Sequence, residues 1–550
     1  MVDGIAQESP RARSRLDAWS VAAVLIAAVV LLPVASVLWI ALRGGGGDIW
    51  PHLLSTTLPR YVSNTLVLMA GVGALTASVG VGAAWLVTMY RFPGRGWLQW
   101  ALLLPLAVPA YVGAYALVDF LEYAGPVQTG LRALFGWESA RDYWFPEIRT
   151  RGAAILVLSG ALYPYVYLLC RAAFREQSGA IFEVAQALGA GAWSRFLRVG
   201  LPLARPAIAA GAAVVMMEVV NDFGAVDYFA VQTLTTGIFS VWLQAGNLAG
   251  AAQISACVLT IVVLLVTLEK ASRRRSRTHA SARALRPLTA QTLRGWTRWA
   301  ATLACLLPFL GGFVLPVAVL ISHSFDAEQW IEPGLAQALL HSLAVGALAA
   351  VLCVALGVIM VYGARLSSRR VPVLLLPVTA IGYAVPGAVL GIGMLIPLAG
   401  FDNRLADLMF RLTGHDPGLI LTGTAAALTL AYVVRFFAVA QGTVDAAMAR
   451  ISPSLPMAAR SLGRSAGGTL RTIHMPLTRA SLGSALLLVF VDSVKELPAT
   501  LLLRPFDFET LATRVQAKAS LEALSEAAPA ALTITLVGLV ATVLLARANR

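Results

Sequence analysis

The chain has 550 residues, of which 58% are hydrophobic and 13% charged, and its mean hydropathy is +0.76. Soluble globular domains carry about a quarter charged residues, so this composition excludes an ordinary soluble protein. The formal net charge of +14 would suit a nucleic-acid partner, but 30 of the 42 Lys and Arg residues fall between or beside apolar runs, in segments that would share one side of a membrane. Because basic residues concentrate in cytoplasmic loops, the charge indicates membrane topology, with both termini inside and no nucleic-acid partner.

Twelve apolar runs are long enough to cross a membrane, since a helix needs about 20 residues to span the hydrocarbon core. The runs are continuously apolar rather than alternating, which favours helices over a membrane barrel. The first is too long for a cleavable signal peptide and is kept as a span. The sequence therefore predicts an all-α integral membrane protein with transmembrane helices near 19–42, 62–89, 98–121, 152–170, 204–222, 249–268, 299–321, 340–364, 371–399, 418–440, 478–500 and 527–546.

A basic segment, 269–298, divides these runs into two sets of six and is predicted to be a cytoplasmic linker. The first half is 1–268 and the second is 299–550. Six spans per half give both halves the same orientation, so the halves form a parallel repeat. Pro109 and Pro386 fall at matching positions and are expected to bend their helices.

A polar, basic loop occurs in both halves, 274 residues apart, at 181–203 and 455–477. The first copy reads EVAQALGAGAWSRFLRVGLP from Glu183, and the second reads MAARSLGRSAGGTLRTIHMP from Met457. We expect each to form two short helices that meet at a glycine, whose missing side chain permits a tight turn. The residues that carry the shared pattern are Glu183, Ala185, Gly189, Leu201 and Pro202, and then Ala459, Gly463, Met475 and Pro476. Because Met457 replaces the glutamate, we expect the two loops to contact their partners unequally.

Ionisable residues recur inside the span that follows each loop. At the same offset of 274 residues, the two sets are Glu218, Asn221 and Asp222, and Asp492, Lys495 and Glu496. A charge within a span costs roughly 2.5–3.5 kcal/mol on insertion scales, so a functional or structural role is expected for these residues. One interpretation is a pathway or gate for a cationic solute, and the other is a structural network in which Lys495 neutralises Asp492.

Tyrosines add further candidates. Tyr111 and Tyr115 share a helix face near the predicted bend and are pathway candidates, whereas Tyr163, Tyr165 and Tyr167 are assigned to the aromatic belt at the cytoplasmic end of their span. The six histidines have no metal-ligand spacing, so a metal site stays unknown. The three lysines do not occur in a phosphate-binding loop, so this chain should bind no ATP and carry no catalytic residue.

The two loops resemble the "EAA" loop of ABC importer permeases. In addition, the segments NDFGAVDYFAVQTLTTGIFSVW (221–242) and VKELPATLLLRPFDFETLATRVQ (494–516) resemble those of fused, two-half ferric-iron permeases. The resemblance implies a type I ABC importer permease fold in a bacterial inner membrane. It also implies that a cytoplasmic ABC ATPase dimer, which uses Mg-ATP, contacts the two loops.

A periplasmic or extracytoplasmic solute-binding protein would then dock on the other side, across 122–151, 323–338 and 501–526. Thiamine, polyamine and phosphonate permeases share parts of the same pattern, so these solutes stay open beside ferric iron. A twelve-span secondary transporter, driven by an ion gradient, is the alternative from a different class.

Overall fold

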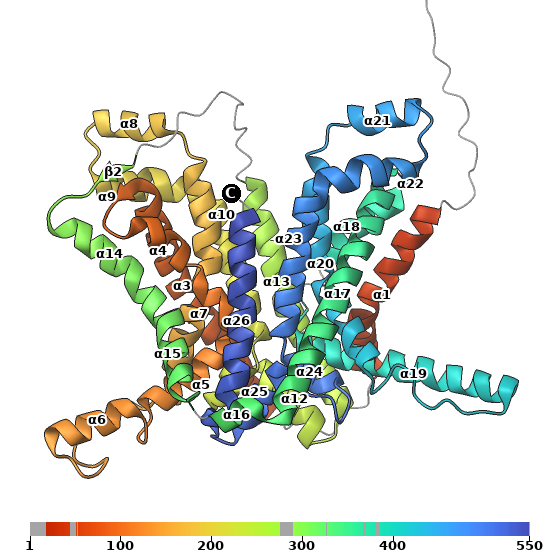
Figure 1. The fold of residues 1–550 in the computed structure, drawn as a ribbon, viewed down its shortest axis with the longest axis horizontal. Helices are drawn as coiled ribbons and strands as arrows, with labels where there is room; N and C mark the ends of the chain where they lie inside the picture. The colour runs from red at the N-terminus through yellow and green to blue at the C-terminus, as the bar shows by residue number, and fades with distance from the viewer. Residues whose placement is uncertain are drawn as a thin grey trace, which may run out of the picture.

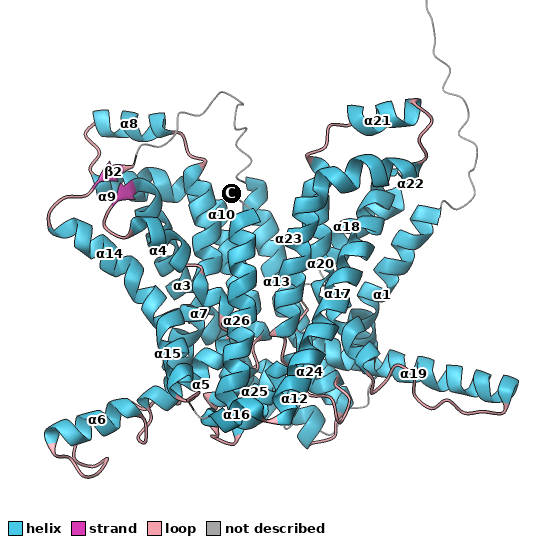
Figure 2. Ribbon diagram, viewed as in Figure 1, coloured by secondary structure: helices cyan, strands magenta, loops and turns pink. Residues whose placement is uncertain are grey.

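The computed structural model describes residues 18–43, 51, 53–275, 290–325, 327–366, 370–380, 382 and 385–548. This part of the chain is helical, apart from a two-residue parallel strand pair, β1 (Tyr90–Arg91) and β2 (Gln291–Thr292) (Figure 2). Eleven of its helices are long and apolar enough to cross a membrane, or twelve when the bent pair 95–107 and 110–135 counts as one span. The predicted all-α membrane fold is therefore confirmed.

The helices of the first half are α1 (Ala18–Arg43), α3 (Leu58–Met89), α4 (Arg95–Ala101), α5 (Ala110–Leu121), α6 (Pro126–Phe135), α7 (Arg151–Arg175), α8 (Gly179–Ala187), α9 (Ala192–Arg195), α10 (Leu201–Asn221), α11 (Gly224–Tyr228), α12 (Leu234–Phe239) and α13 (Leu248–Arg275). The helices of the second half are α14 (Trp296–Phe309), α15 (Leu315–Ser322), α16 (Ala327–Ile331), α17 (Pro333–Leu366), α18 (Arg370–Thr379), α19 (Gly387–Thr413), α20 (Ala425–Ala449), α21 (Ser454–Ser461), α22 (Ala466–Thr469), α23 (Met475–Val494), α24 (Pro498–Leu503), α25 (Leu511–Ser520) and α26 (Leu524–Ala548). Short 3-10 or π-helical turns at Leu53–Thr57, Leu104–Ala107, Phe196–Gly200, Ser240–Gln244, Leu310–Val314 and Leu470–His474 extend several of them.

The two halves form two similar helix bundles that lie side by side (Figure 1). Helices α3, α7 and α10 pack together in one bundle, and α17, α20 and α23 pack together in the other. Helices α8 and α21 lie at the same end of the molecule, here named the loop end, and α12, α16 and α25 lie at the opposite end, named the far end (Figure 1). Helix α26 also finishes at the loop end, as does the start of α1 (Figure 1).

The first span of each half packs on the other half. Helix α1 contacts α17, α18 and α19, whereas α14 and α15 contact α3, α4 and α5 (Figure 1). Glycines permit both approaches, because a Cβ on Gly312 would overlap the Gly160 carbonyl and a Cβ on Gly393 would overlap the Pro33 carbonyl. Small residues bring membrane helices close in this way. The division at 268 and 299 remains a prediction about the sequence repeat, and the packing exchanges one span across it.

The contact at Gly312 gives a direct test of this exchange. We expect Gly312→Ala to destabilise the purified chain by about 1–3 kcal/mol, because the added methyl group overpacks the crossing with α7. Gly311→Ala is the matched control, since a Cβ there meets nothing within 4 Å. Thermal unfolding in detergent measures both variants, and equal midpoints for the two would contradict the crossing.

The third span of each half is broken, which corrects the predicted continuous spans 98–121 and 371–399. In the first half, helical segments 95–107 and 110–135 meet at 94°. Val108 there is extended, with φ −95° and ψ 120°, as the residue before a proline prefers, and Pro109 starts the next segment. In the second half, α18 ends at Thr379 and α19 begins directly after Pro386. The prolines were expected to bend these helices, and the structure shows that they redirect the chain towards the side.

The predicted linker 269–298 is only partly described. Helix α13 continues to Arg275, and the chain is described again from residue 290, where β2 pairs with β1. Residues 276–289, with three of the nine Lys and Arg residues of this segment, lie outside the described residues, as do residues 1–17 before α1.

Candidate functional site

The first repeated loop folds as two short helices joined by a glycine turn. Helix α8 ends at Ala187, and the chain turns at Gly189, whose φ of +82° lies in the left-handed region that glycine adopts without strain. The Ala190 N–H donates to the Ala185 carbonyl over 2.9 Å and closes the turn. A Cβ on Gly189 would meet nothing within 4 Å, so the backbone conformation, and not crowding, requires glycine.

The second loop has the same geometry. Helix α21 ends at Ser461, Gly463 has the same φ of +82°, and the Arg464 N–H donates to the Ala459 carbonyl over 3.0 Å. A Cβ on Gly463 would also meet nothing within 4 Å. The alanine and glycine that the sequence pattern selected in each copy thus hold equivalent positions in one repeated turn.

Both loops lead without a break into a long helix. Leu201 and Pro202 begin α10, and Met475 and Pro476 begin α23. Proline fits these positions because the first turn of a helix leaves its N–H groups unpaired and proline has none. Each loop is therefore continuous with a helix that runs towards the far end.

Where each loop joins its bundle, an aromatic ring packs against the residue just before the long helix. The ring is larger and the packed residue smaller in the first half than in the second. In the first half, Trp85 packs so closely on Gly200 that a Cβ there would overlap the indole ring. In the second half, the smaller ring of Tyr362 packs edge-on against His474, with ring centroids 5.1 Å apart. The Tyr362 hydroxyl also donates to the Ala466 carbonyl over 2.7 Å. Because both junctions are tightly packed, a displacement of either loop would also move the long helix that follows it, α10 or α23.

Each loop presents a large apolar side chain to solvent at its tip. Leu188 is 83% exposed, and Leu462, 274 residues later, is 85% exposed. Glu183 and its counterpart Met457 are also exposed, on the helix that precedes the tip. The two loop tips thus present the same apolar side chain at matching positions of the repeat.

A cavity of about 130 Å³, lined by both charged and apolar side chains, lies between the two halves. Glu218 lies roughly 25 Å along α10 from Leu201, at 1.5 Å per residue, so the cavity is nearer the far end than the loop end. Seven of the predicted pathway residues line it together: Tyr111, Glu218, Asn221, Asp222, Asp492, Lys495 and Glu496. Tyr165 and Arg435, which the sequence analysis did not select, line it as well.

Asp222 and Glu496 cap two short helices beside the cavity. Asp222 accepts the N–H groups of two residues in the first turn of α11, over 3.1 and 3.0 Å. Glu496 accepts two N–H groups at the start of α24, both over 3.1 Å. An acidic side chain at a helix start satisfies N–H groups that have no partner in the helix. The repeated acid therefore has a structural role in both halves as well as a place in the cavity wall.

Arg435 links the halves across the cavity. Its guanidinium lies 3.1 Å from a Glu496 carboxylate oxygen and donates to the Asn221 side-chain oxygen over 3.2 Å. The same Asn221 oxygen accepts the Gly387 N–H over 2.9 Å. Arg435 is one of the 30 basic residues that the sequence assigned to segments between or beside the apolar runs, and the structure corrects this, because the residue lies within α20 and is 8% exposed. Its position inside the apolar run 418–440 was the signal that could have identified it.

Lys495 forms an ion pair with Asp492 over 2.8 Å, as the structural interpretation of this cluster expected. Glu218, which corresponds to Asp492 in the repeat, lines the same cavity from the first half. The cavity wall thus contains four carboxylates and two cationic side chains. Among the described residues, no group of three or more His, Cys, Asp or Glu side chains is placed to hold a metal ion.

Of the tyrosines considered in the sequence, Tyr111 and Tyr165 line the cavity and Tyr115 does not, which differs in part from the prediction. The Tyr111 hydroxyl is buried at the cavity without a hydrogen-bond partner in the described part of the chain. Tyr115 does not line the cavity, because its hydroxyl donates to Gln516 and its ring packs against Tyr228 with centroids 4.5 Å apart. Tyr165, which was assigned to the aromatic belt, lines the cavity instead.

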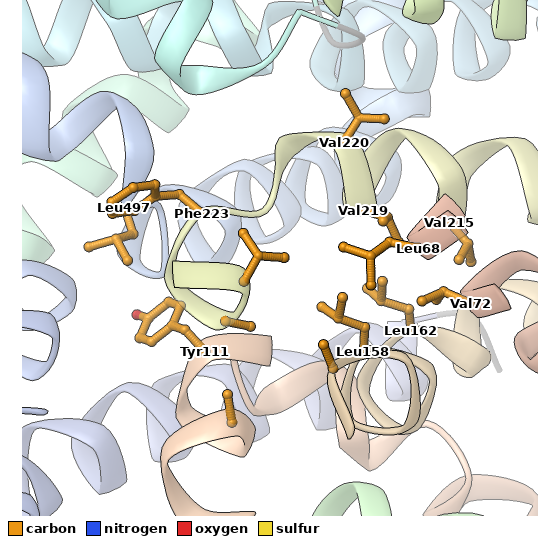
Figure 3. Close-up of a cluster of buried hydrophobic side chains, with 14 of the residues drawn as sticks. Leu68, Val72, Tyr111, Leu158, Leu162, Val215, Val219, Val220, Phe223 and Leu497 are labelled. Carbon is orange, nitrogen blue, oxygen red and sulfur yellow. The ribbon is translucent and has the colours of Figure 1, made fainter. Parts of the chain in front are cut away.

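Apolar side chains pack beside the cavity and hold its walls in place. Figure 3 shows Leu158 and Leu162 of α7 next to Val215 and Val219 of α10, with Tyr111 beside α11. A Cβ on the first residue of α11 would crowd both Tyr111 and Leu497, so the short helix touches both halves.

The comparisons with known proteins agree with this architecture. Residues 77–278 match the family model described as "Binding-protein-dependent transport system inner membrane component". The matched segment contains the first loop, α10 and the short helices that follow it.

Three curated relatives cover different shares of the chain. The Fe(3+)-transport system permease protein FbpB 2 of Haemophilus influenzae is 25% identical over 88% of this chain and 89% of its own length. The molybdenum transport system permease protein ModB of Escherichia coli is 27% identical over 40% of this chain and 91% of its own length. The sulfate transport system permease protein CysT of Escherichia coli is 24% identical over 43% of this chain and 84% of its own length.

A solved chain from a bacterial alginate ABC transporter, in complex with an alginate pentasaccharide-bound periplasmic protein, covers 47% of this chain and 96% of its own length. The sequence identity between the two chains is 19%, and the TM-score is 0.39. The family model and the iron-permease relative, which spans both halves, set aside the ion-gradient transporter and describe a transport subunit rather than an enzyme. Residues 77–278 are therefore the inner membrane component of a binding-protein-dependent transport system, and the chain as a whole is similar, across both halves, to an ABC importer permease.

Proposed function

We propose that this permease imports ferric iron, which an extracytoplasmic solute-binding protein delivers to the far end. The observation that carries the proposal is the charge of the cavity between the halves, where four carboxylates face two cationic side chains. The two cations are already paired, Arg435 with Glu496 over 3.1 Å and Lys495 with Asp492 over 2.8 Å. Acidic side chains therefore outnumber basic ones around the cavity, which favours a cation. The relative that aligns with both halves is named as an Fe(3+)-transport permease, which supports the same solute.

The two loops are the proposed coupling surfaces for a cytoplasmic ABC ATPase dimer. In this proposal the loop end is cytoplasmic, both termini are cytoplasmic, and Mg-ATP is used by the ATPase chains, with no cofactor bound by the permease. The exposed tips at Leu188 and Leu462 would insert into one ATPase subunit each. Glu183 would take part in the first contact only, because Met457 stands at its position in the second.

The energy of ATP hydrolysis would reach the cavity because the ATPase dimer binds two conformations of the permease with different affinities. An ATPase dimer that binds one arrangement of the two loops more tightly than another shifts the permease towards that arrangement. Because the loops continue into α10 and α23, the shift would move the segments that carry Glu218 and Asp492 relative to each other. A solute held between the halves would then be exposed to one side or the other.

An oxyanion is the second candidate solute, because the ModB and CysT relatives are named for molybdenum and sulfate transport. The cationic side chains of Arg435 and Lys495 are the feature that favours it. Thiamine, polyamines and phosphonates remain as further alternatives from the sequence pattern.

Uptake in cells with and without this chain tests the proposal. We expect deletion to abolish the accumulation of isotopic ferric iron at limiting iron, and the intact gene to restore it. Isotopic molybdate and sulfate uptake, measured in the same two strains, are the controls. Unchanged iron uptake together with lost molybdate or sulfate uptake would assign the oxyanion in place of iron.

A further inference from the structure

Two helical arms extend sideways from the bundle in opposite directions at the far end (Figure 1). The first arm is α6 with the segment 136–150, and the second arm is the last part of α19 with its following segment, 400–424. Each helix ends at a glycine with φ +70°, Gly136 in the first arm and Gly414 in the second. The arms are therefore a repeated feature of the two halves.

The helix of the first arm has one apolar face. Val127, Leu131 and Leu134 recur at i, i+4 and i+7, which is the spacing of a single stripe along a helix. The segment that follows folds onto the other face, where the Tyr143 hydroxyl donates to the Gln128 side chain over 2.6 Å. The stripe is partly buried at Val127 and Leu131 and opens towards the end of the helix, where Leu134 is 75% exposed.

The second arm repeats this design with a longer stripe. Phe401, Leu405, Leu408 and Leu412 recur at i, i+4, i+7 and i+11, and Leu412 is also 75% exposed. The following segment is again tied away from the stripe, because the Asp402 carboxylate accepts the N–H groups of residues 421 and 422, over 3.1 and 2.6 Å. Arg404 and Arg411 lie on the helix face opposite to the return segment.

We propose that both arms lie in the surface layer of the membrane at the far end, with their apolar stripes against lipid acyl chains. The bundle crosses the membrane, so lipid surrounds it, and the arms extend outwards into the space that lipid occupies. A helix with an apolar stripe on one side and charged residues on another lies in this layer. Arg404 and Arg411 would then meet the lipid headgroups.

The direction of the arms favours lipid over a protein partner. Helix α19 is continuous from Gly387, which contacts the cavity network, to Thr413, so the bundle fixes the orientation of the second arm. A solute-binding protein centred over α12, α16 and α25 would leave the ends of both arms uncovered (Figure 1). The inference therefore assigns a lipid contact to α6, within the range 122–151 where a protein contact was expected from the sequence. It does not depend on which solute is transported.

Spin labels on the full chain in nanodiscs of phosphatidylethanolamine and phosphatidylglycerol test the proposal. Leu134→Cys and Leu412→Cys place labels on the two stripes, in a chain whose Cys170, Cys257, Cys305 and Cys353 are replaced by alanine. Thr129→Cys and Arg411→Cys are the matched controls on the other faces of the same helices. We expect the two stripe labels to be severalfold more accessible to oxygen than to a soluble nickel chelate, and the controls to show the reverse. Greater accessibility of the stripe labels to the chelate would overturn the proposal.

A second measurement keeps all four native cysteines. A photoactivatable benzoylphenylalanine in place of Leu412 is expected to crosslink to phospholipid, and the same residue in place of Arg411 is expected to do so severalfold less. Equal or reversed crosslinking to phospholipid would overturn the membrane contact. Loss of the lipid crosslink when a solute-binding protein is added would show that a protein occupies the stripe, and would overturn the proposal as well.

Discussion

Replacing both loop glycines, with Gly189→Ala and Gly463→Ala in one chain, is expected to abolish solute uptake while the permease still inserts and folds. Both positions have φ +82°, a conformation that costs a residue with a Cβ about 1–2 kcal/mol. Because neither Cβ would meet a neighbour within 4 Å, the substitution acts on the turn alone. Two such costs, about 2–4 kcal/mol together, would lower the population of the native turns by roughly 30-fold or more.

Matched controls are available in the same two loops. Gly191 has φ −65° and Gly467 lies in α22, and a Cβ on either would meet nothing within 4 Å. The pair Gly191→Ala and Gly467→Ala should therefore leave uptake near the wild-type level. Uptake is measured in cells that contain equal amounts of each permease in the membrane. Full activity of the Gly189 and Gly463 variant would show that the turns do not couple to transport.

These turns were predictable because their geometry is local. Gly189 and Gly463 recur in register with Ala185 and Ala459, and a glycine between two short helices has few structures available. The span count was predictable for a similar reason, since the length and composition of an apolar run decide whether it can cross a membrane. Even so, the proline breaks in the third spans were expected only as bends, because the backbone on both sides of a proline sets the new direction.

Long-range packing explains what the sequence did not reveal. Hydropathy places α1 in the first half, but its contacts are set by shape, such as the fit of Gly393 against Pro33. Arg435 was counted as a loop charge because a basic residue near the end of an apolar run usually is one. Its partner Asn221 comes from the other half, 214 residues away, and no local pattern can reveal that contact.

Arg435→Met is expected to destabilise the permease by about 3–5 kcal/mol and to abolish uptake. The substitution removes the cation of a buried pair and leaves the Glu496 carboxylate, whose side chain is 1% exposed, without its charge partner. It also removes one of the hydrogen bonds that join Asn221 to the second half. Thermal unfolding in detergent measures the loss. Arg365→Met is the matched control, because its pair with Asp445 is exposed and should contribute about 0–1 kcal/mol.

Adding Glu496→Gln to Arg435→Met separates the structural role of this pair from a role in transport. The double variant buries no unpaired charge, and an amide oxygen can still accept N–H groups at the start of α24, so most of the lost stability should return. If the charges also form the solute pathway, uptake should stay absent in this restabilised chain. Recovery of stability and uptake together would mean that the pair only holds the halves in place, and would leave the pathway to Glu218 and Asp222. Failure of the second substitution to restore stability would contradict the buried pair itself.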